Sequence, residues 1–492
     1  MLDEWRLFWV GRGGTPAPSD GFGLGAWTHL PERERELGLR DRQPILVDPC
    51  GRVDPRLVGF FRRSWFSTRS FGTQDAYVRD YRLFFTFLWR AGCHWDQARA
   101  EHLDNWEHWR LRGEGNPARI GGAKWQRELA ALRGLYDWAL ARGFVKASPV
   151  VLRSVRTRDG AVVEVPELAP ADVRSSNVKW LTPRAYRLWR EVGLRGRWPD
   201  GRVDAGWRGR NEGRDAAFAD IVFSSGVRRR EAGSLLTVEL PDLEVGRRYY
   251  PGRVARAVAK RAERYSYVSH GALKAVESYR LTARAAAVAR AQEQGWYERI
   301  VDLRVVEHVG RRGDIVWTER GGGRGRARLG DLDRRVRRTL FRRGPEGLEP
   351  LAVWLTETGM PLQHTSWNAV FDRANARCEA LELRVFATPH MLRHSMALRV
   401  LVSLHFALDR RLGLSPVQRR DYEELYGNVW AIVKDLLGHR SEETTREIYL
   451  EPLRGLQLET LLRDETPENN EVLARLAQRT GLVLDVPTLE WA

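Results

Sequence analysis

Apolar residues recur at three- and four-residue steps in the first third of the chain. One stripe consists of Tyr77, Tyr81, Phe84, Phe85 and Leu88. A second stripe contains Leu129, Leu132, Tyr136 and Leu140. This spacing predicts two amphipathic helices between Thr68 and Phe144 that pack through their apolar faces. A further helix is predicted from Leu103 to about Leu111, so we expect a small helical bundle here.

Helix signals continue in the second half of the chain. Thr182 is predicted to cap a helix whose first position is Pro183 and which runs through Trp189. Residues Ala216–Leu236 are helical in pattern but contain Gly226, which we expect to turn the chain between two helices.

Strand signals are fewer. Alternating residues at Arg253–Ala259 and Arg264–Val268 predict a β-hairpin, with Lys260 at the start of its turn.

Three stretches show no regular period. Residues 1–60 mix Gly, Pro and charge and are predicted to be an irregular N-terminal arm, whereas 153–178 has the composition of an interdomain linker. The segment Gly321–Arg328 is so rich in Gly and Arg that we expect a flexible basic insertion.

Size and charge narrow the class of protein. A chain of 492 residues exceeds the usual size of one domain, and 43% hydrophobic residues are enough to build packed cores. The formal net charge of +17 favours a polyanionic partner, nucleic acid above all, although an arginine bias spread over a solvated surface gives the same number. The predicted bundle leaves this choice open, because its cations suit either a DNA backbone or a solvated face. They are Arg79, Arg82, Lys124, Arg127 and Arg133.

Cysteine content and hydropathy point to the cytoplasm. Cys50, Cys93 and Cys378 are too scattered for a disulfide framework or a zinc site. No uncharged apolar run approaches the roughly 18 residues of a membrane span, and the opening Met1–Gly14 does not read as a secretion signal. We therefore predict a cytoplasmic protein with no membrane association.

One short segment combines a helix start with cationic side chains. It reads Thr388-Pro389-His390-Met391-Leu392-Arg393-His394-Ser395. Thr388 and Pro389 start a helix, so His390, Arg393 and His394 share a face near its N-terminus, where an anion is attracted. An imidazole and a guanidinium there can grip one phosphate, although such a pair is also a common surface feature.

A second segment ends one helix and begins another. Gly438 is predicted to end an apolar helix that starts near Val429, and His439 follows it directly. Thr444 and Thr445 then open a short segment that presents Tyr449, a residue that taken singly would be a core aromatic.

These segments, together with Gly226-Val227-Arg228-Arg229-Arg230-Glu231, resemble the tyrosine recombinase (phage integrase) family. Three separated motifs occur in the family's order: an Arg-x-x-Glu helix start, a His-x-x-Arg-His box, and a Leu-Gly-His segment followed by Tyr. The resemblance implies a mainly α fold, with an N-terminal helical core-binding (SAM-like) domain and a mixed α/β, predominantly helical catalytic domain that has a small β-sheet.

The resemblance also implies roles for single residues. Arg228 and Arg393 match the two arginines that hold the scissile phosphate. His390 matches the position that manages the tyrosine proton, and His439 the one that hydrogen-bonds the phosphate. Tyr449 matches the nucleophile, which forms a 3′-phosphotyrosine and frees a 5′-hydroxyl.

Further matches are weaker or secondary. Lys260 matches the family's lysine, the general acid for the departing 5′-oxygen, but the usual Gly-Lys-Gly start is absent and Arg261 and Lys274 stay open as alternatives. His394 is expected to have a packing or supporting role, and Glu231 to orient its neighbours.

The implied organisation follows the family with some departures. The expected parts are an arm at 1–60, a core-binding domain at 61–152, a linker at 153–178, a catalytic domain at 179–455 with insertions near 285–350 and 405–428, and a tail at 456–492. His439 and Tyr449 are one residue further apart than is common in the family, a departure that bears on the helix register before the tyrosine.

The function implied is site-specific DNA recombination without metal, nucleotide or other cofactor. The expected partners are double-stranded DNA, three further copies of the chain in a tetramer on DNA, and accessory DNA-bending factors, with the protein at the nucleoid when it acts. His390, His394 and His439 are not expected to bind a metal, because Arg393 among them would repel a cation. Two alternatives remain: an accessory DNA-binding protein that has lost cleavage, and a DNA-relaxing topoisomerase.

Overall fold

The protein is described by a computed structural model in which the chain divides into two compact units, Met1–Arg174 and Ser175–Ala492. The residues described are 3–11, 32, 36, 38–156, 160–170, 179–259, 263–406, 415–426, 428–443, 445–446, 449 and 483–484. Helices account for 48% and strands for 17%, which confirms the mainly helical fold class with a mixed α/β second part. Among the described residues, no helix has the length and apolar character needed to cross a bilayer.

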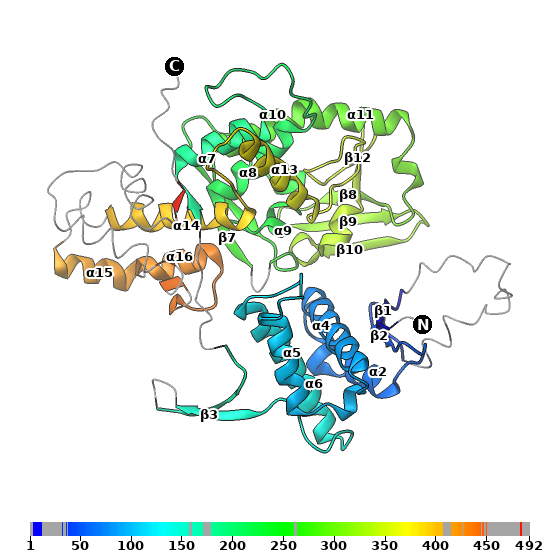
Figure 1. Cartoon of the computed structure of the whole chain (residues 1–492). Coiled ribbons are helices and arrows are strands. Elements are labelled where there is room, and N and C mark those ends of the chain that lie inside the picture. The colour runs from blue at the N-terminus through cyan, green and yellow to red at the C-terminus, as the bar shows by residue number, and fades with distance from the viewer. Residues whose placement is uncertain are drawn as a thin grey trace. The chain divides into compact units, whose positions relative to one another are not determined.

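The first unit is a helical bundle with two small antiparallel sheets (Figure 1). Its elements are β1 (Arg6–Trp9), β2 (Pro44–Val47), α2 (Pro55–Arg62), α3 (Ser64–Ser67), α4 (Phe71–Arg90), η3 (Trp95–Gln97), α5 (Ala100–Leu111), α6 (Gly122–Ala141), β3 (Leu152–Arg156) and β4 (Val162–Pro166). The two predicted stripes lie on α4 and α6 and line the core, where Tyr81 and Tyr136 are fully buried. Leu140, at the end of its stripe, is 45% exposed instead.

The first 60 residues contain more regular structure than the sequence predicts. Strands β1 and β2 pair along their whole length. Just before β1, the backbone N–H of Trp5 donates to Oγ1 of Thr86 at 3.1 Å, and the Trp5 ring packs edge-on against Phe85. Four-residue strands are too short to give an alternating pattern, and the contact that holds them to α4 is tertiary, so periodicity alone does not reveal them.

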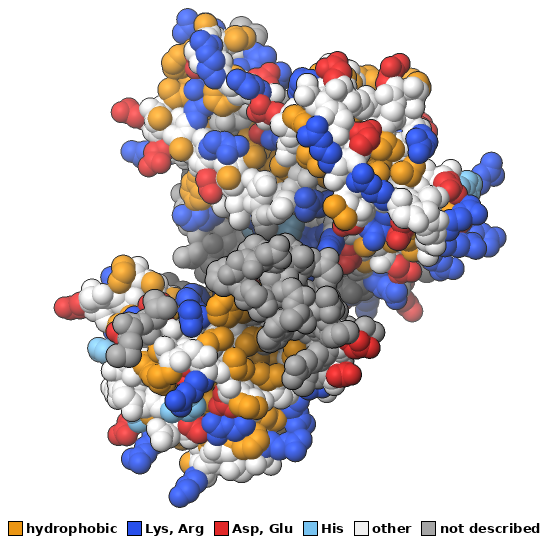
Figure 2. All heavy atoms as spheres, turned by 90° about the vertical axis from the view of Figure 1, so that its right-hand side faces the viewer, with side chains coloured by type: hydrophobic (Ala, Val, Ile, Leu, Met, Phe, Trp, Pro, Cys, Tyr) orange, Lys and Arg blue, Asp and Glu red, His pale blue; other side chains and the backbone are white. Residues whose placement is uncertain are grey.

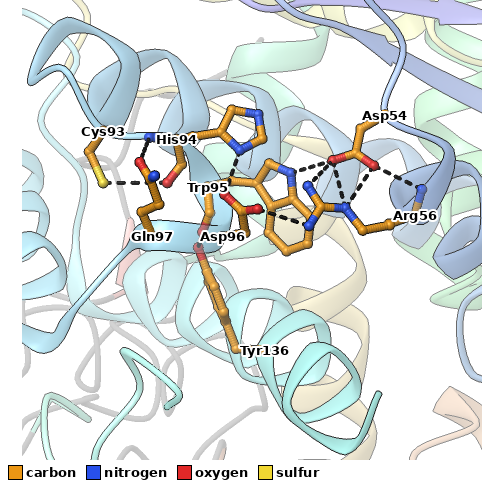
Figure 3. A network of polar contacts seen from close by, with 8 residues as sticks. All are labelled: Asp54, Arg56, Cys93, His94, Trp95, Asp96, Gln97 and Tyr136. Atoms are coloured by element: carbon orange, nitrogen blue, oxygen red, sulfur yellow. Dashed lines mark hydrogen bonds and ion pairs between the residues drawn. The ribbon is translucent and has the colours of Figure 1, made fainter. Parts of the chain in front are cut away.

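A polar network joins the start of α2 to the turn after α4 (Figure 3). Asp54 caps α2 by accepting from the backbone N–H of Arg56 at 2.8 Å, and it also accepts from the Trp95 indole at 2.9 Å. The Arg56 guanidinium bridges Asp54 and Asp96, each at 2.8 Å, and lies over the Trp95 ring. Tyr136 of α6 donates to the Trp95 carbonyl at 2.7 Å, so the network ties three helical segments together.

The second unit has a helical centre, with a five-stranded sheet at one side and α14, α15 and α16 at the other (Figure 1). Its first elements are β5 (Trp180–Leu181), α7 (Pro183–Trp189), η4 (Arg190–Leu194), α8 (Glu212–Ser225), α9 (Arg229–Ala232), η5 (Thr237–Glu239), β6 (Tyr249–Val254), β7 (Arg264–Ser269), α10 (His270–Tyr279), η6 (Arg280–Arg284), α11 (Ala285–Glu293) and η7 (Tyr297–Arg299). Then follow β8 (Arg304–Val309), β9 (Asp314–Glu319), β10 (Arg324–Arg328), η8 (Leu329–Asp331), α12 (Arg334–Arg338), β11 (Leu340–Gly344), β12 (Gly347–Pro350), α13 (Ser366–Ala380), α14 (Pro389–Phe406), α15 (Pro416–Tyr426), α16 (Val429–Leu437) and β13 (Val483–Leu484).

Helix α8 is the central element of this unit. Nearly every side chain along it is buried, and the Phe218 ring stacks on Trp367 of α13 with centroids 3.6 Å apart. Gly226 ends α8 in the left-handed conformation, with φ of +66°, and turns the chain into α9, as predicted. The predicted cap of α7 is also confirmed, because Oγ1 of Thr182 accepts from the backbone N–H of Ala185.

The predicted hairpin exists, with one strand displaced. Strand β6 pairs antiparallel with β7 from Tyr249 to Val254, so the prediction that the first strand covers Arg253–Ala259 is wrong. The last pair of the hairpin is Val254 with Arg264, and the chain turns after it. The alternation of the sequence continues past Ala255, although no strand forms there.

The segment around Gly321–Arg328 corrects a second prediction. It is not a flexible insertion, because Arg324–Arg328 forms β10 at the edge of the sheet ordered β10-β9-β8-β11-β12. Gly325 is required there, since a Cβ would lie 2.3 Å from the Trp317 ring of β9. The glycine that reads as a loop signal is therefore a site of close packing.

Candidate active site

Helix α14 places one arginine at the centre of the second unit. Thr388 caps the helix by accepting from the backbone N–H of Met391 at 3.2 Å, as the sequence predicts. One turn later Arg393 points inward and is 2% exposed. Burial lowers the pKa of Arg393, and the charges of Arg228 and Arg264 lower it further, yet a guanidinium of this strength keeps its proton at neutral pH.

The C-terminus of α16 is the meeting point of three arginines. Its last carbonyl groups accept hydrogen bonds from one guanidinium each: Leu436 from Arg264 at 3.0 Å, Leu437 from Arg393, and Gly438 from Arg228 at 3.2 Å. The Arg393 guanidinium also donates to the carbonyl of Gly226 at the end of α8. The negative end of the α16 dipole therefore helps to hold three cations together.

A single buried carboxylate braces two of these cations. Glu231, which is 4% exposed, accepts from Arg228 at 3.1 Å and from Arg264 at 2.6 Å and 3.1 Å. Burial alone would raise the pKa of Glu231, but the hydrogen bonds and charges of Arg264 and Arg228 bring it down to about 2. In the part of the chain that the structure describes, Glu231 is the one carboxylate paired with them, so three cations face one anion.

Tyr449 lies beside this arginine group and is fully buried. Its hydroxyl is 2.6 Å from Nδ1 of His394, and its ring is parallel to that of His439, with centroids 6.4 Å apart. Its ring also packs on Trp180 of β5. Burial raises the pKa of Tyr449 against the opposing effect of Arg393, so the phenol carries its proton at neutral pH.

The two remaining candidate histidines lie nearby. Nδ1 of His439 is 3.0 Å from Oγ1 of Thr445, which fixes the imidazole after α16. His390 is exposed at the start of α14, with its ring 5.6 Å from that of His394. The structure thus brings five of the predicted residues into one region: Arg228, His390, Arg393, His439 and Tyr449. Lys260 lies outside the described residues, as does Arg261.

Two residues of this site have a larger part than the sequence analysis gave them. Arg264 was expected only as a strand residue, yet its side chain is 7% exposed and contacts both Glu231 and α16. His394 is expected to have a packing or supporting role, yet its Nδ1 atom contacts the Tyr449 hydroxyl directly. Burial lowers the pKa of His394 to about 3, with neighbouring His390 and Arg393 adding to the effect, so the imidazole is neutral.

The chemistry of this arrangement is that of an anion site next to a hydroxyl group. The three arginines and one glutamate carry a net charge of +2, which can bind a phosphate. The neutral imidazole can accept the proton of the phenol. No group of three or more His, Cys, Asp or Glu side chains that can hold a metal ion occurs among the described residues.

Comparison with known protein families gives a match in the first unit. Residues 61–143 match the phage integrase N-terminal SAM-like domain family. No curated protein matches the sequence. The match identifies an integrase-type SAM-like domain at residues 61–143, and the ordered motifs of the second unit keep their resemblance to the tyrosine recombinase family.

The similarity of the chain to solved structures is weak. The XerH site-specific recombinase, bound to a palindromic difH substrate in a post-cleavage complex, is 13% identical over 80% of each chain, with a TM-score of 0.40. The Tn1549 transposon integrase in complex with circular intermediate DNA is 13% identical over 73% of this chain and 82% of its own, with a TM-score of 0.35. XerA recombinase is 13% identical over 84% and 99%, with a TM-score of 0.30. At such scores no residue's role is transferred from them.

Proposed function

We propose that this protein is a site-specific DNA recombinase of the integrase type, which cuts and rejoins strands through a 3′-phosphotyrosine on Tyr449. The observation that carries the proposal is the contact of the Tyr449 hydroxyl with His394, the residue after Arg393, which belongs to a group of three arginines with one carboxylate. Such an excess of fixed positive charge next to a nucleophile favours a reaction at a phosphodiester.

The proposed reaction exchanges one phosphodiester for another. The Tyr449 oxygen attacks phosphorus, the bond from phosphorus to the 5′-oxygen breaks, and the 5′-strand leaves as a hydroxyl. Negative charge grows on the non-bridging oxygens in the transition state, where Arg228 and Arg393 stabilise it more than in the ground state. A 5′-hydroxyl of another strand then attacks the phosphotyrosine and restores Tyr449, so no metal or nucleotide is consumed.

The phenol proton needs an acceptor, because burial keeps Tyr449 protonated. His394 is the neutral imidazole in contact with the hydroxyl, and we assign it the role of accepting or orienting that proton. The family resemblance favours His390 for this role. Its ring lies next to that of His394, so we propose that it acts on the phenol proton through His394. His439 is proposed to donate a hydrogen bond to the phosphate.

The departing 5′-oxygen needs a proton donor. Lys260 is the proposed general acid on the strength of its position in the hairpin connection between β6 and β7. The proposed partners remain double-stranded DNA and three further copies of the chain, with the N-terminal helical unit as core-binding domain.

The proposal is tested by trapping on a nicked suicide substrate made from the DNA that flanks the gene. Attack near the nick releases a short strand and prevents religation, so a covalent protein–DNA band accumulates on a denaturing gel. We expect the band with Tyr449 and none with Tyr449→Phe. DNA binding without a covalent band on any flanking sequence would favour the accessory DNA-binding protein instead.

A further inference from the structure

Helix α12 is fixed to the second unit by one buried arginine. Arg337 is 2% exposed, and its guanidinium makes two hydrogen bonds to the Glu239 carboxylate, at 2.7 Å and 2.9 Å. Asp333 caps the helix by accepting from the backbone N–H groups of Arg335 and Val336. These contacts place α12 firmly, although it lies in the sheet-bearing insertion outside the predicted motifs.

The same helix directs two arginines toward the start of α13. Arg334 and Arg338 are four residues apart and so lie on one side of α12. Nη1 of Arg334 is 2.7 Å from Nε2 of His364, which lies two residues before α13. The charges of both arginines lower the pKa of His364.

Helix α9 adds two more arginines. Arg229 contacts the Asn368 side chain of α13, and Arg230 has a buried Nε atom without a hydrogen-bond partner. Gly233 allows this close approach, because a Cβ there would lie 3.2 Å from the Cβ of His364. The charges of four arginines therefore act on one imidazole, and we call them the arginine cluster: Arg229, Arg230, Arg334 and Arg338.

The arginine cluster has little compensating negative charge, because Glu231, whose charge acts on Arg230, is paired with Arg228 and Arg264. Within the described part of the chain, none of its four members forms an ion pair with Asp or Glu, in contrast to Arg337 beside them. Burial and, after it, the charges of Arg334, Arg229, Arg230 and Arg338 together lower the pKa of His364 to about 4. The imidazole is therefore neutral at pH 7 and neither adds to the positive charge of the cluster nor compensates it.

We propose that the arginine cluster binds a backbone phosphate of duplex DNA, next to the phosphate held by Arg228 and Arg393. The four cations repel one another, and a phosphodiester would supply the missing anion with oxygens for several charge-assisted hydrogen bonds. Arg229 follows Arg228 directly in the chain, so the second phosphate belongs to the same DNA segment as the first. The choice of DNA as ligand rests on the proposed function.

The test compares two double variants that remove equal charge from the same insertion. Arg334→Gln/Arg338→Gln removes half of the arginine cluster. Arg335→Gln/Arg343→Gln removes two exposed arginines of α12 and β11 and serves as the control. Binding of a fluorescent duplex of about 30 base pairs is measured by anisotropy over a range of salt concentrations, in the Tyr449→Phe background to exclude covalent attachment.

The expected result is a clear difference between the two variants. Loss of one phosphate contact lowers the slope of log affinity against log salt by about 1, and we expect this with the cluster variant, with a several-fold weaker affinity at moderate salt. The control should retain the slope of the parent. Equal effects of both variants, or none from the cluster variant, would overturn the proposal. Arg338→Gln alone, an exposed position, repeats the test should the double variant unfold.

Two further readouts separate this proposal from others. Inorganic phosphate is added to parent and cluster variant in thermal unfolding. A cluster-dependent stabilisation by phosphate, with unchanged DNA binding, would mean that the site takes free phosphate and would overturn the DNA assignment. A cluster-dependent salt slope in a protein that gives no covalent band would support the phosphate site while the recombinase function fails.

Discussion

Nδ1 of His394 lies 2.6 Å from the hydroxyl of Tyr449. This contact joins the box on α14 to the tyrosine that follows α16, two parts of the sequence 55 residues apart. Both groups are largely buried, and burial shifts both pKa values toward the neutral form. The pair is therefore a neutral phenol in hydrogen-bond contact with a neutral imidazole.

The first prediction concerns this proton acceptor. His394→Ala removes the group that contacts the phenol, and we expect the rate of covalent complex formation to fall by about 100-fold, the usual size of a general-base effect. Rates are measured by single-turnover trapping on the suicide substrate. His308→Ala, an exposed position of β8, is the control. A larger loss in His390→Ala than in His394→Ala would assign the proton to His390 instead.

The second prediction is a pH dependence of stability. His394 has a pKa of about 3 in the folded protein, below the ordinary value of 6.5, so the unfolded chain binds the proton first. Its contribution to the free energy of unfolding is therefore complete above pH 6.5 and is lost as the pH falls toward 3. Urea unfolding between pH 7.5 and 5 should show a smaller decrease for His394→Phe than for the parent. Identical decreases would contradict the depressed pKa.

The third prediction concerns the carboxylate that braces the arginines. Glu231→Gln leaves Arg228 and Arg264 without their buried anion, and we expect a loss of about 3–5 kcal/mol in the free energy of unfolding. Glu244→Gln, which removes an exposed partner of Arg247, should cost less than about 1 kcal/mol. Urea denaturation of both variants measures the difference, and similar small losses would refute a structural role for Glu231.

Glu231 also predicts that the free energy of unfolding depends on pH in the acid range. Its folded pKa of about 2 lies below the ordinary 4.5, so its contribution is present above pH 4.5 and is lost as the pH falls toward 2. In the Glu231→Gln variant this part of the acid-induced loss should be missing.

The fourth prediction tests the turn that delivers Arg228. Gly226 has φ of +66°, and a Cβ would lie 2.9 Å from Sδ of Met396. Gly226→Ala should therefore destabilise the protein by about 1–3 kcal/mol. Gly213→Ala, in the first turn of the same helix with nothing within 4 Å of its Cβ, should be neutral or slightly stabilising. Thermal unfolding of the two variants is the measurement, and equal shifts would contradict the strain argument.

Local signals in the sequence predict much of this architecture. The caps at Thr182 and Thr388 and the left-handed glycines at Gly226 and Gly438 are found where they were predicted, because each depends on a few adjacent residues. The motifs also predict which side chains belong together, since Arg228, Arg393 and Tyr449 do meet. Their chemical roles stay predictions.

The features that the sequence does not reveal depend on contacts between distant segments. Arg264 reads as an ordinary strand residue, and only the packing of β7 against α9 and α16 brings it to Glu231. The segment of β10 has the composition of a loop because Gly325 leaves room for the Trp317 ring of the neighbouring strand β9. His394 and His390 lie one turn apart on α14, so the sequence alone does not separate their roles. The contact of His394 with the hydroxyl of the buried Tyr449 distinguishes them.

The most direct test of the proposed function is to locate the DNA on the protein. The trapped complex is digested with protease and nuclease, and the peptides are examined by mass spectrometry. We predict a single nucleotide-bearing peptide with the modification on Tyr449, linked to the 3′-end of the DNA. A nucleotide on any other residue, or a 5′-linkage, would contradict the assignment of Tyr449 as the nucleophile.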